Sequence, residues 1–340
     1  MKKVLLVDGN NLFKIGYHGV KNMFHKGNHI GAIYHFMNTL KNFLKEYNYD
    51  KVIVFWDDKE NSLQRKLIYP NYKANRKEKL NKFQLDSYNW QQKRLKEYLE
   101  EVFIRQISIE GNEADDMIAY YCQISENEKK TIFSSDVDLT QLINENVEIY
   151  QPSTKNILKN GDKVKLHEIE VPHQNICVFK IINGDNSDNI AGIRYMGEKT
   201  INKLFPMITE RVVSLNEILR IAEDLHKNDK DNRAIQNLLS GKTKYGIYGD
   251  EFFQINEKII NLSTPLLTDE ARDTVEQYYN EDLDPEGRSY KNLMKMMTSD
   301  GIFKFLPKYD DAWVDFIRPF TKLTRKETKK NVKRKKYKNE

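Results

Sequence analysis

Short aliphatic runs alternate with segments of helical periodicity along the first half of the chain, and this alternation restricts the fold most strongly. Helical patterns occupy residues 31–47, 88–101 and 113–125. The aliphatic runs are 3–7, 51–56, 102–109, 130–133 and 147–150. Strands that alternate with helices typically build a mostly parallel sheet with helices on its faces. The sequence therefore predicts an α/β domain.

The strand pattern stops near residue 180, and the rest of the chain is helical in pattern with polar interruptions. A length of 340 residues exceeds what a single hydrophobic core usually supports. We therefore expect a sheet-containing domain over residues 1–180 and a helical domain over 181–320. Residues 321–340 would form a basic, disordered tail.

Charge is distributed unevenly. The formal net charge is +5, but residues 321–340 hold ten Lys or Arg against two Glu, so the rest of the chain is mildly acidic. A uniformly basic coat for nucleic acid is therefore excluded, and any such contacts should be local. Cys122 and Cys177 are too few for a disulfide framework, and no apolar run is long enough to span a membrane. These features predict a soluble, cytoplasmic protein without a membrane partner.

Acidic residues follow the predicted strands or begin the helices that come after them. They are Asp8, Asp57, Glu113, Asp115, Asp116, Asp136, Asp138, Asp185 and Asp188. Because the carboxyl ends of parallel strands meet at one edge of a sheet, we expect these side chains to share a pocket. Each acid alone also fits a turn or a helix cap. Because several acids occur at the ends of predicted strands or the starts of predicted helices, a common site is favoured.

So many carboxylates in one pocket need counter-charge, since each close pair costs roughly 4 kcal/mol at an effective dielectric near 20. Hard divalent cations, Mg²⁺ or Mn²⁺, prefer such oxygen ligands. The number of acids indicates two ions, which together clamp the attacking and leaving oxygens of a phosphodiester. Calcium storage is the alternative, but the chain lacks the twelve-residue loop with Gly at its sixth position.

Six sequence blocks match one family in order and spacing. They are VDGNN (7–11), VFWD (54–57), IYPNYKANR (68–76), NEADD (112–116), SSDVDLTQL (134–142) and GDNSDNIAGIRYMGEKT (184–200). The chain resembles the structure-specific 5′ nucleases: flap endonucleases, the 5′-nuclease domain of bacterial DNA polymerase I, and bacteriophage RNase H-type 5′–3′ exonucleases. The resemblance spans about residues 1–210, and the segment 256–306 looks most like the phage enzymes.

The resemblance implies a fold and a set of site residues. The fold would be a PIN-like domain with a helical arch at about 58–100, followed by a helix–hairpin–helix (H3TH) element. A first metal site would use Asp8, Asp57, Glu113, Asp115 and Asp136. A second would use Asp136, Asp138, Asp185 and Asp188, partly through water. Asp116 would support the ligands from behind.

The resemblance also implies a metal-dependent activity on the 5′ ends of RNA or DNA in branched duplexes and RNA–DNA hybrids. The biological use would be removal of RNA primers or flaps during phage DNA replication. The protein would act as a monomer in the host-cell cytoplasm, with a single-strand-binding protein or a sliding clamp as partners.

Residues 65–82 carry seven Lys or Arg and one Glu. A charge run of this kind is usually a solvated loop, but here it directly follows a strand-end acid and matches the family's arch. Arg65, Lys73 and Arg76 are the candidates for contact with the scissile phosphate. Tyr69 or Tyr72 would stack on a base, worth about 1–3 kcal/mol, or would pack into the core.

Residues 192–205 form a helix–turn–helix pattern with Gly192 and Gly197 in its turns. Backbone amides at such turns, with Lys199 and Thr200, would grip the duplex phosphates without reading sequence. Tyr195 stands where the family usually has the first glycine, which bears on whether this turn binds K⁺. An ordinary helical hairpin is the alternative.

Three rival functions fit less well. PIN-type ribonucleases are much shorter and lack the GDNSDN block. A haloacid-dehalogenase-type phosphatase needs an acid at position 10, which is Asn10 here. A catalytically silent module that binds branched DNA would have lost metal ligands, yet none of the expected acids is missing.

Overall fold

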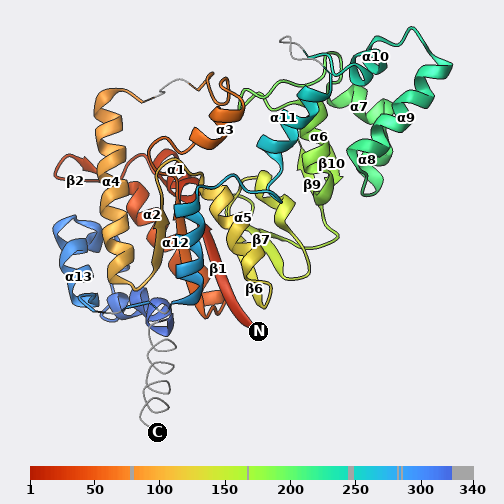
Figure 1. Ribbon diagram of the computed structural model, residues 1–340. Coiled ribbons are helices and arrows are strands. Elements are labelled where there is room, and N and C mark those ends of the chain that lie inside the picture. The colour runs from red at the N-terminus through yellow and green to blue at the C-terminus, as the bar shows by residue number, and fades with distance from the viewer. Residues whose placement is uncertain (77–79, 167, 244–248, 282, 285, 324–340) are drawn as a thin grey trace.

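A six-stranded sheet forms the centre of the protein (Figure 1). The computed structural model describes residues 1–76, 80–166, 168–243, 249–281, 283–284 and 286–323. The strands, in spatial order, are β5 (Arg105–Ser108), β4 (Lys51–Trp56), β1 (Lys2–Asp8), β6 (Glu128–Phe133), β7 (Val147–Gln151) and β8 (Asn156–Leu158). Only β8 runs antiparallel to its neighbour. The predicted α/β class with a mostly parallel sheet is therefore confirmed.

Strand β1 shows how this sheet is buried on both faces. Its side chains alternate between the two faces because successive residues of a strand point in opposite directions. Leu5 and Val7 join one hydrophobic core, and Val4 and Leu6 join the other. All four are fully buried, which is why the sequence shows a continuous aliphatic run instead of an alternation.

Helices cover both faces of the sheet (Figure 1). The core that contains Leu5 includes residues of α1 (Gly9–Gly19), α2 (Gly31–Glu46), α4 (Lys82–Glu101) and α13 (Tyr290–Ser299). The core that contains Leu6 includes residues of α5 (Ala114–Ile124) and α12 (Asp269–Asn280). The chain thus returns to the sheet after residue 260.

A separate hydrophobic core joins a β-hairpin to the helices after residue 175. The hairpin is β9 (Lys163–Leu166) with β10 (Ile169–Pro172). The helices are α6 (Ile176–Asn183), α7 (Glu198–Leu204), α8 (Met207–Glu210), α9 (Leu215–Asn228), α10 (Arg233–Leu239) and α11 (Asp250–Ile260). Their buried residues form one cluster. The region predicted as one helical domain, 181–320, is therefore divided between this core and the sheet.

The remaining described elements are short. They are the hairpin β2 (Phe24–His25) with β3 (Asn28–His29), helix α3 (Leu63–Ile68), and the 3-10 helices at Asp138–Leu142, His173–Asn175 and Ile302–Phe305. Among the described helices, none combines the length and the hydropathy needed to cross a membrane.

Helix α4 begins six residues before the predicted start at 88. Asn81 accepts a hydrogen bond from the Gln84 amide, and the Gln84 side chain accepts one from the Asn81 amide, which completes a capping box. The same helix ends at Glu101, so the strand predicted from 102 starts only at Arg105. The predicted strands at 51–56 and 147–150 and the predicted helix at 31–47 are confirmed to within a residue.

Candidate active site

Three neighbouring strands deliver carboxylates to the same edge of the sheet. Asp8 is the last residue of β1, Asp57 directly follows β4, and Asp136 lies three residues beyond β6. β1 pairs with both other strands in parallel, so all three acids lie at the carboxyl edge. The predicted convergence of strand-end acids is confirmed for this group.

Hydrogen bonds fix the positions of two of these carboxylates. Asp8 accepts from the Asn11 amide and from the Ser134 hydroxyl, both at 2.9 Å, and so caps α1 while it contacts the end of β6. Asp57 accepts from the Ala114 amide at 2.9 Å, which connects β4 to the first turn of α5. The start of α5 carries three further acids, Glu113, Asp115 and Asp116.

Gly9 allows this strand end to pack tightly. A side chain at position 9 would come within 2.6 Å of the Trp56 ring and 2.8 Å of the Phe55 carbonyl oxygen. Glycine is therefore required as the first residue of α1, the helix that Asp8 caps. Trp56 itself is fully buried and stacks on Phe36.

Asp8, Asp57, Asp115 and Asp136 form one electrostatic group, which we call the uncompensated acids. Burial, together with repulsion from Asp57 and Asp136, raises the pKa of Asp8 to about 7. Burial and the neighbouring carboxylates of Asp136 and Asp8 also raise the pKa of Asp115 well above its usual range. Within the described residues, no Lys, Arg or His forms an ion pair with any of the four.

The other five acids each have a basic partner, and we call them the paired acids. Glu113 pairs with Arg65 at 2.9 Å and with Lys73 at 2.5 Å, Asp116 pairs with Arg65, Asp188 pairs with Arg76, and Asp138 and Asp185 share Lys180. Burial raises the pKa of Asp185, but Lys180 and Ser187 outweigh it and bring that pKa to about 2. Burial and repulsion from Asp136 raise the pKa of Asp138 to about 6 despite Lys180.

Lys180 is a site residue that the sequence interpretation did not include. It lies on α6, with its ammonium 2.7 Å from Asp185 Oδ2 and in contact with Asp138. These two acids outweigh the effect of burial and raise the Lys180 pKa above its usual value. The available signal was a single lysine in the apolar run ICVFKIIN, five residues before Asp185.

The uncompensated acids fit a hard divalent cation. Their donors are all carboxylate oxygens, which Mg²⁺ and Mn²⁺ prefer. The raised pKa values of Asp8 and Asp115 reflect burial and repulsion between carboxylates, which a bound cation would relieve. In the part of the chain that the structure describes, no three Asp, Glu, His or Cys side chains already stand as a metal cage. Among the paired acids, Glu113, Asp188 and Asp185 contact Lys73, Arg76 and Lys180.

Comparison with known proteins agrees with this arrangement. Residues 3–170 match the family model of the 5′–3′ exonuclease N-terminal resolvase-like domain. The chain is 32% identical over 252 residues to the 5′–3′ exonuclease of Buchnera aphidicola subsp. Schizaphis graminum, which covers 73% of this chain and 84% of that protein. The chain belongs to the 5′–3′ exonuclease family.

Solved structures share the fold of this 5′–3′ exonuclease family member. The bacteriophage T5 5′-exonuclease with bound zinc superimposes with a TM-score of 0.64 at 21% identity, covering 87% of this chain and 99% of that one. A T5 flap endonuclease in complex with DNA and metal ions gives a TM-score of 0.60 at 20% identity, covering 88% and 98%. The predicted 5′-nuclease family is thus confirmed.

Arg65 is buried, whereas the sequence predicted an exposed residue in contact with the scissile phosphate. Its side chain is buried, donates to the Ile259 carbonyl at 2.9 Å and pairs with Glu113 and Asp116. A guanidinium enclosed in this way neutralises acids and leaves no face for a substrate phosphate. Arg65 is therefore not among the residues that we expect to contact the phosphate.

Both candidate stacking tyrosines are buried. Tyr69 and Tyr72 belong to the core of the hairpin and the helices after it, and Tyr72 donates to Glu113 at 3.2 Å or to Asp188 at 3.0 Å. The sequence left open whether these tyrosines stack on a base or pack into the core, and in the structure they pack into the core. Lys73 and Arg76 differ, because their side chains retain 16% and 51% exposure next to the acids.

The helix–turn–helix pattern begins close to the paired acids. A side chain at Gly192 would come within 2.0 Å of the Asn183 carbonyl oxygen, so only glycine fits there. Gly197 is exposed at the start of α7, which carries Lys199 and Thr200. Tyr195, at the position where glycine was expected, adopts the left-handed conformation with φ of 69°. The backbone thus keeps the shape that a glycine would favour.

Proposed function

We propose that this protein is a divalent-metal-dependent 5′–3′ exonuclease or flap endonuclease, cleaving phosphodiesters near the 5′ ends of branched or 5′-ended duplexes. The observation that carries the proposal is the set of uncompensated acids at the carboxyl edge of the sheet. Buried carboxylates with raised pKa values, without a basic partner in the described chain, are typical of a metal-dependent site. The T5 relative that was solved with DNA and metal ions supports the same conclusion.

The proposed metal ligands cross the division of the acids, because the paired acid Glu113 would join the first site and Asp136 would serve both sites. Asp8, Asp57, Glu113, Asp115 and Asp136 would hold a first ion, and Asp136, Asp138, Asp185 and Asp188 a second, with Asp116 behind them. When bound, the ions supply Lewis acidity to the phosphodiester and neutralise the carboxylates. Mg²⁺ is the proposed physiological ion, and Mn²⁺ has the same ligand preference.

Lys73 and Arg76 would hold the scissile phosphate. Each is bound to a proposed metal ligand, Lys73 to Glu113 and Arg76 to Asp188. Burial lowers the pKa of Lys73, but Glu113 and Asp188 outweigh it and keep that pKa above its usual value, so the ammonium stays charged. Once cations occupy the acids, both side chains can exchange their carboxylate partners for phosphate oxygens. Residues of the segment 58–100 would then form the arch that admits a single-stranded 5′ end.

The duplex next to the cleavage site would lie on the helix–turn–helix element. Gly192 and Gly197 would present backbone amides, and Lys199 and Thr200 side-chain donors, to the phosphates. A K⁺ ion would belong to the same turn. Residues 324–340, which include most of the basic tail, lie outside the described residues, and their composition would add salt-dependent affinity.

The biological role would be removal of RNA primers or flaps during replication, in a phage-infected cell if the gene is phage-borne. Single-strand-binding protein or a sliding clamp would be the partners. A panel of 5′-flap, nicked and RNA-primed duplexes tests the proposal, assayed with Mg²⁺ and with EDTA. Products only with Mg²⁺ support it. Binding in both conditions without product would instead indicate a silent DNA-binding module.

A further inference from the structure

A cavity lies at the end of the sheet opposite to the acids. It has a volume of about 560 Å³, within the range of small-molecule sites. The segments that line it are the amino-terminal ends of β1, β6 and β7, the 47–49 segment before β4, and the residues after β8. Because these strands are parallel, the cavity and the candidate active site occupy opposite ends of the sheet.

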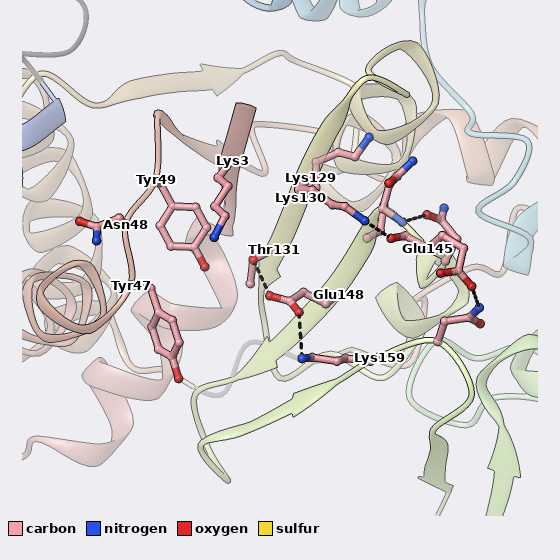
Figure 2. Close-up of a pocket in the computed structure, with 14 residues that line it drawn as sticks. Lys3, Tyr47, Asn48, Tyr49, Lys129, Lys130, Thr131, Glu145, Glu148 and Lys159 are labelled. Carbon is pink, nitrogen blue, oxygen red and sulfur yellow. Dashed lines mark hydrogen bonds and ion pairs between the residues drawn. The ribbon is translucent and has the colours of Figure 1, made fainter. Parts of the chain in front are cut away.

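The cavity lining is positively charged and aromatic. It includes four lysines against two glutamates, together with Tyr47 and Tyr49. Figure 2 shows Tyr47, Tyr49 and Lys3 on one side of the cavity, with Lys129, Glu148 and Lys159 on the other. Such a lining suits a ligand that has both a ring and an anionic group.

The glutamates are largely engaged by their neighbours. Glu148 accepts from the Thr131 hydroxyl at 2.9 Å and lies 3.8 Å from Lys159, and Glu145 accepts from Asn160 at 2.7 Å. These bonds hold the carboxylates within the wall. The lining keeps a net positive charge, because its lysines outnumber its glutamates.

Two lysines keep charge that no carboxylate neutralises. In the described chain, no hydrogen bond or ion pair engages the Lys3 ammonium, and Lys129 donates to a neutral acceptor, the Glu145 carbonyl, at 2.6 Å. Lys130 is different: it is buried and donates to the Ser125 carbonyl at 2.5 Å. Lys3 and Lys129 are therefore the groups that can meet an incoming phosphate.

Tyr47 supplies a surface for a flat ring. It is partly exposed at the cavity, and its ring lies 4.7 Å from that of Phe43, which holds it in place. The side chains of Asn48, Asn144 and Asn146 stand around the same opening and offer both donors and acceptors. A nucleobase presents the matching combination of a flat face and a polar edge.

We propose that this cavity binds a 5′-mononucleotide, with its phosphate between Lys3 and Lys129 and its base on Tyr47. The choice of a nucleotide over another aromatic phosphate rests on the proposed function, because a 5′ nuclease that leaves 5′-phosphates releases such molecules. The site is separated from the acids by the length of the sheet, so it binds its ligand without the catalytic metal.

Calorimetric titration of the full chain in EDTA tests this proposal. Adenosine 5′-monophosphate is expected to bind with a Kd below about 1 mM, and adenosine and inorganic phosphate about tenfold more weakly or worse. Lys3→Ala and Lys129→Ala should each weaken the nucleotide about tenfold, whereas Lys258→Ala, an exposed lysine on α11, should not. Equal binding of nucleotide and phosphate, or the same loss in all three variants, would overturn it.

A second measurement needs no variant. Amide resonances of residues 129–131 and 144–148 in the wild-type protein should shift on titration with the nucleotide in EDTA, while those of 113–116 stay in place. Shifts confined to 113–116, or none, would reject the cavity as the site.

Cleavage of flap duplexes by Lys3→Ala and Lys129→Ala with Mg²⁺ should remain at the wild-type rate. The nucleotide site and the nuclease activity can therefore fail independently.

Discussion

The two sets of acids share one edge of the sheet but differ in how their charge is balanced. The paired acids have Arg65, Lys73, Arg76 and Lys180 as ion-pair partners. The uncompensated acids have no such partner among the described residues, and burial together with their mutual repulsion raises the pKa of Asp8 and of Asp115. A metal at the uncompensated acids relieves an existing repulsion. A metal at Asp138 and Asp185 must first displace an ammonium. We therefore expect the first ion to bind more tightly than the second.

Asp136→Asn should have the largest effect, because Asp136 faces both sets. Loss of metal-supplied charge stabilisation costs several kcal/mol, so turnover should fall by about three orders of magnitude. Binding of flap DNA in the absence of metal should remain within about threefold, since the carboxylate repels phosphate. Single-turnover cleavage and gel-shift assays measure the two quantities.

Asp58→Asn is the matched control for that experiment. Asp58 follows Asp57 but accepts from the Lys59 amide and the Ser108 hydroxyl instead of joining the acids. Its variant should cleave normally. Wild-type turnover by Asp136→Asn, or an equal loss in both variants, would contradict the division of the acids.

Lys73→Ala should come next, with a rate lowered by about a hundredfold and an affinity changed little. Lys73 pairs with Glu113, a proposed ligand of the first ion, and its side chain keeps 16% exposure. Lys66→Ala, an exposed neighbour on α3, serves as the control. If Lys73→Ala weakened affinity and left the rate intact, Lys73 would hold the DNA and not the reacting phosphate.

Lys180→Ala tests the paired set through stability. Removing one partner from largely buried ion pairs should destabilise the metal-free protein by about 3 kcal/mol. Mg²⁺ should then raise the melting temperature of the variant more than that of the wild type. Lys203→Ala on α7 is an exposed control. An unchanged melting temperature in EDTA would show that Lys180 does not neutralise these acids.

Asp8→Asn should give the smallest effect, and it depends on pH. The folded-state pKa of Asp8, about 7, lies above the ordinary 3.8, so its charge costs stability increasingly as the pH rises between these values. Near pH 4 the variant should be about 1–2 kcal/mol less stable than the wild type, because the bonds from Asn11 and Ser134 are weakened while no charge cost is relieved. At pH 8 in EDTA it should be about 2 kcal/mol more stable, because the relieved charge cost then exceeds that loss. Thermal melts across this range measure it. A gain that is equal at both pH values would contradict the raised pKa.

Local patterns predicted the sheet and the acids well, because a strand-end position is encoded by a few adjacent residues. Asp8 and Asp57 directly follow aliphatic runs, and the parallel pairing of their strands brings both acids to the same end of the sheet. The basic partners were harder to predict. Arg65 pairs with Glu113, 48 positions away in sequence, and Lys180 joins nearby Asp185 to Asp138, which lies 42 positions away. Composition placed Arg65 among the exposed charges, while tertiary packing buried it.

Three short strands after residue 155 were also missed. β9 and β10 have four residues each and owe their order to the core that they share with the helices after residue 175, through Val164 and Val171. Four residues of alternating pattern are too few to distinguish a strand from a loop. The division of residues 181–320 between two cores has the same origin, because nothing local in α12 or α13 indicates which core they join.

Anomalous scattering from crystals soaked in Mn²⁺ tests the central claim most directly. The account predicts a strong peak among Asp8, Asp57, Asp115 and Asp136 at low Mn²⁺ concentration, and a weaker one near Asp138 and Asp185 that appears only at higher concentration as Lys180 moves away. Full occupancy at Asp138 and Asp185 with no peak among the uncompensated acids would contradict it.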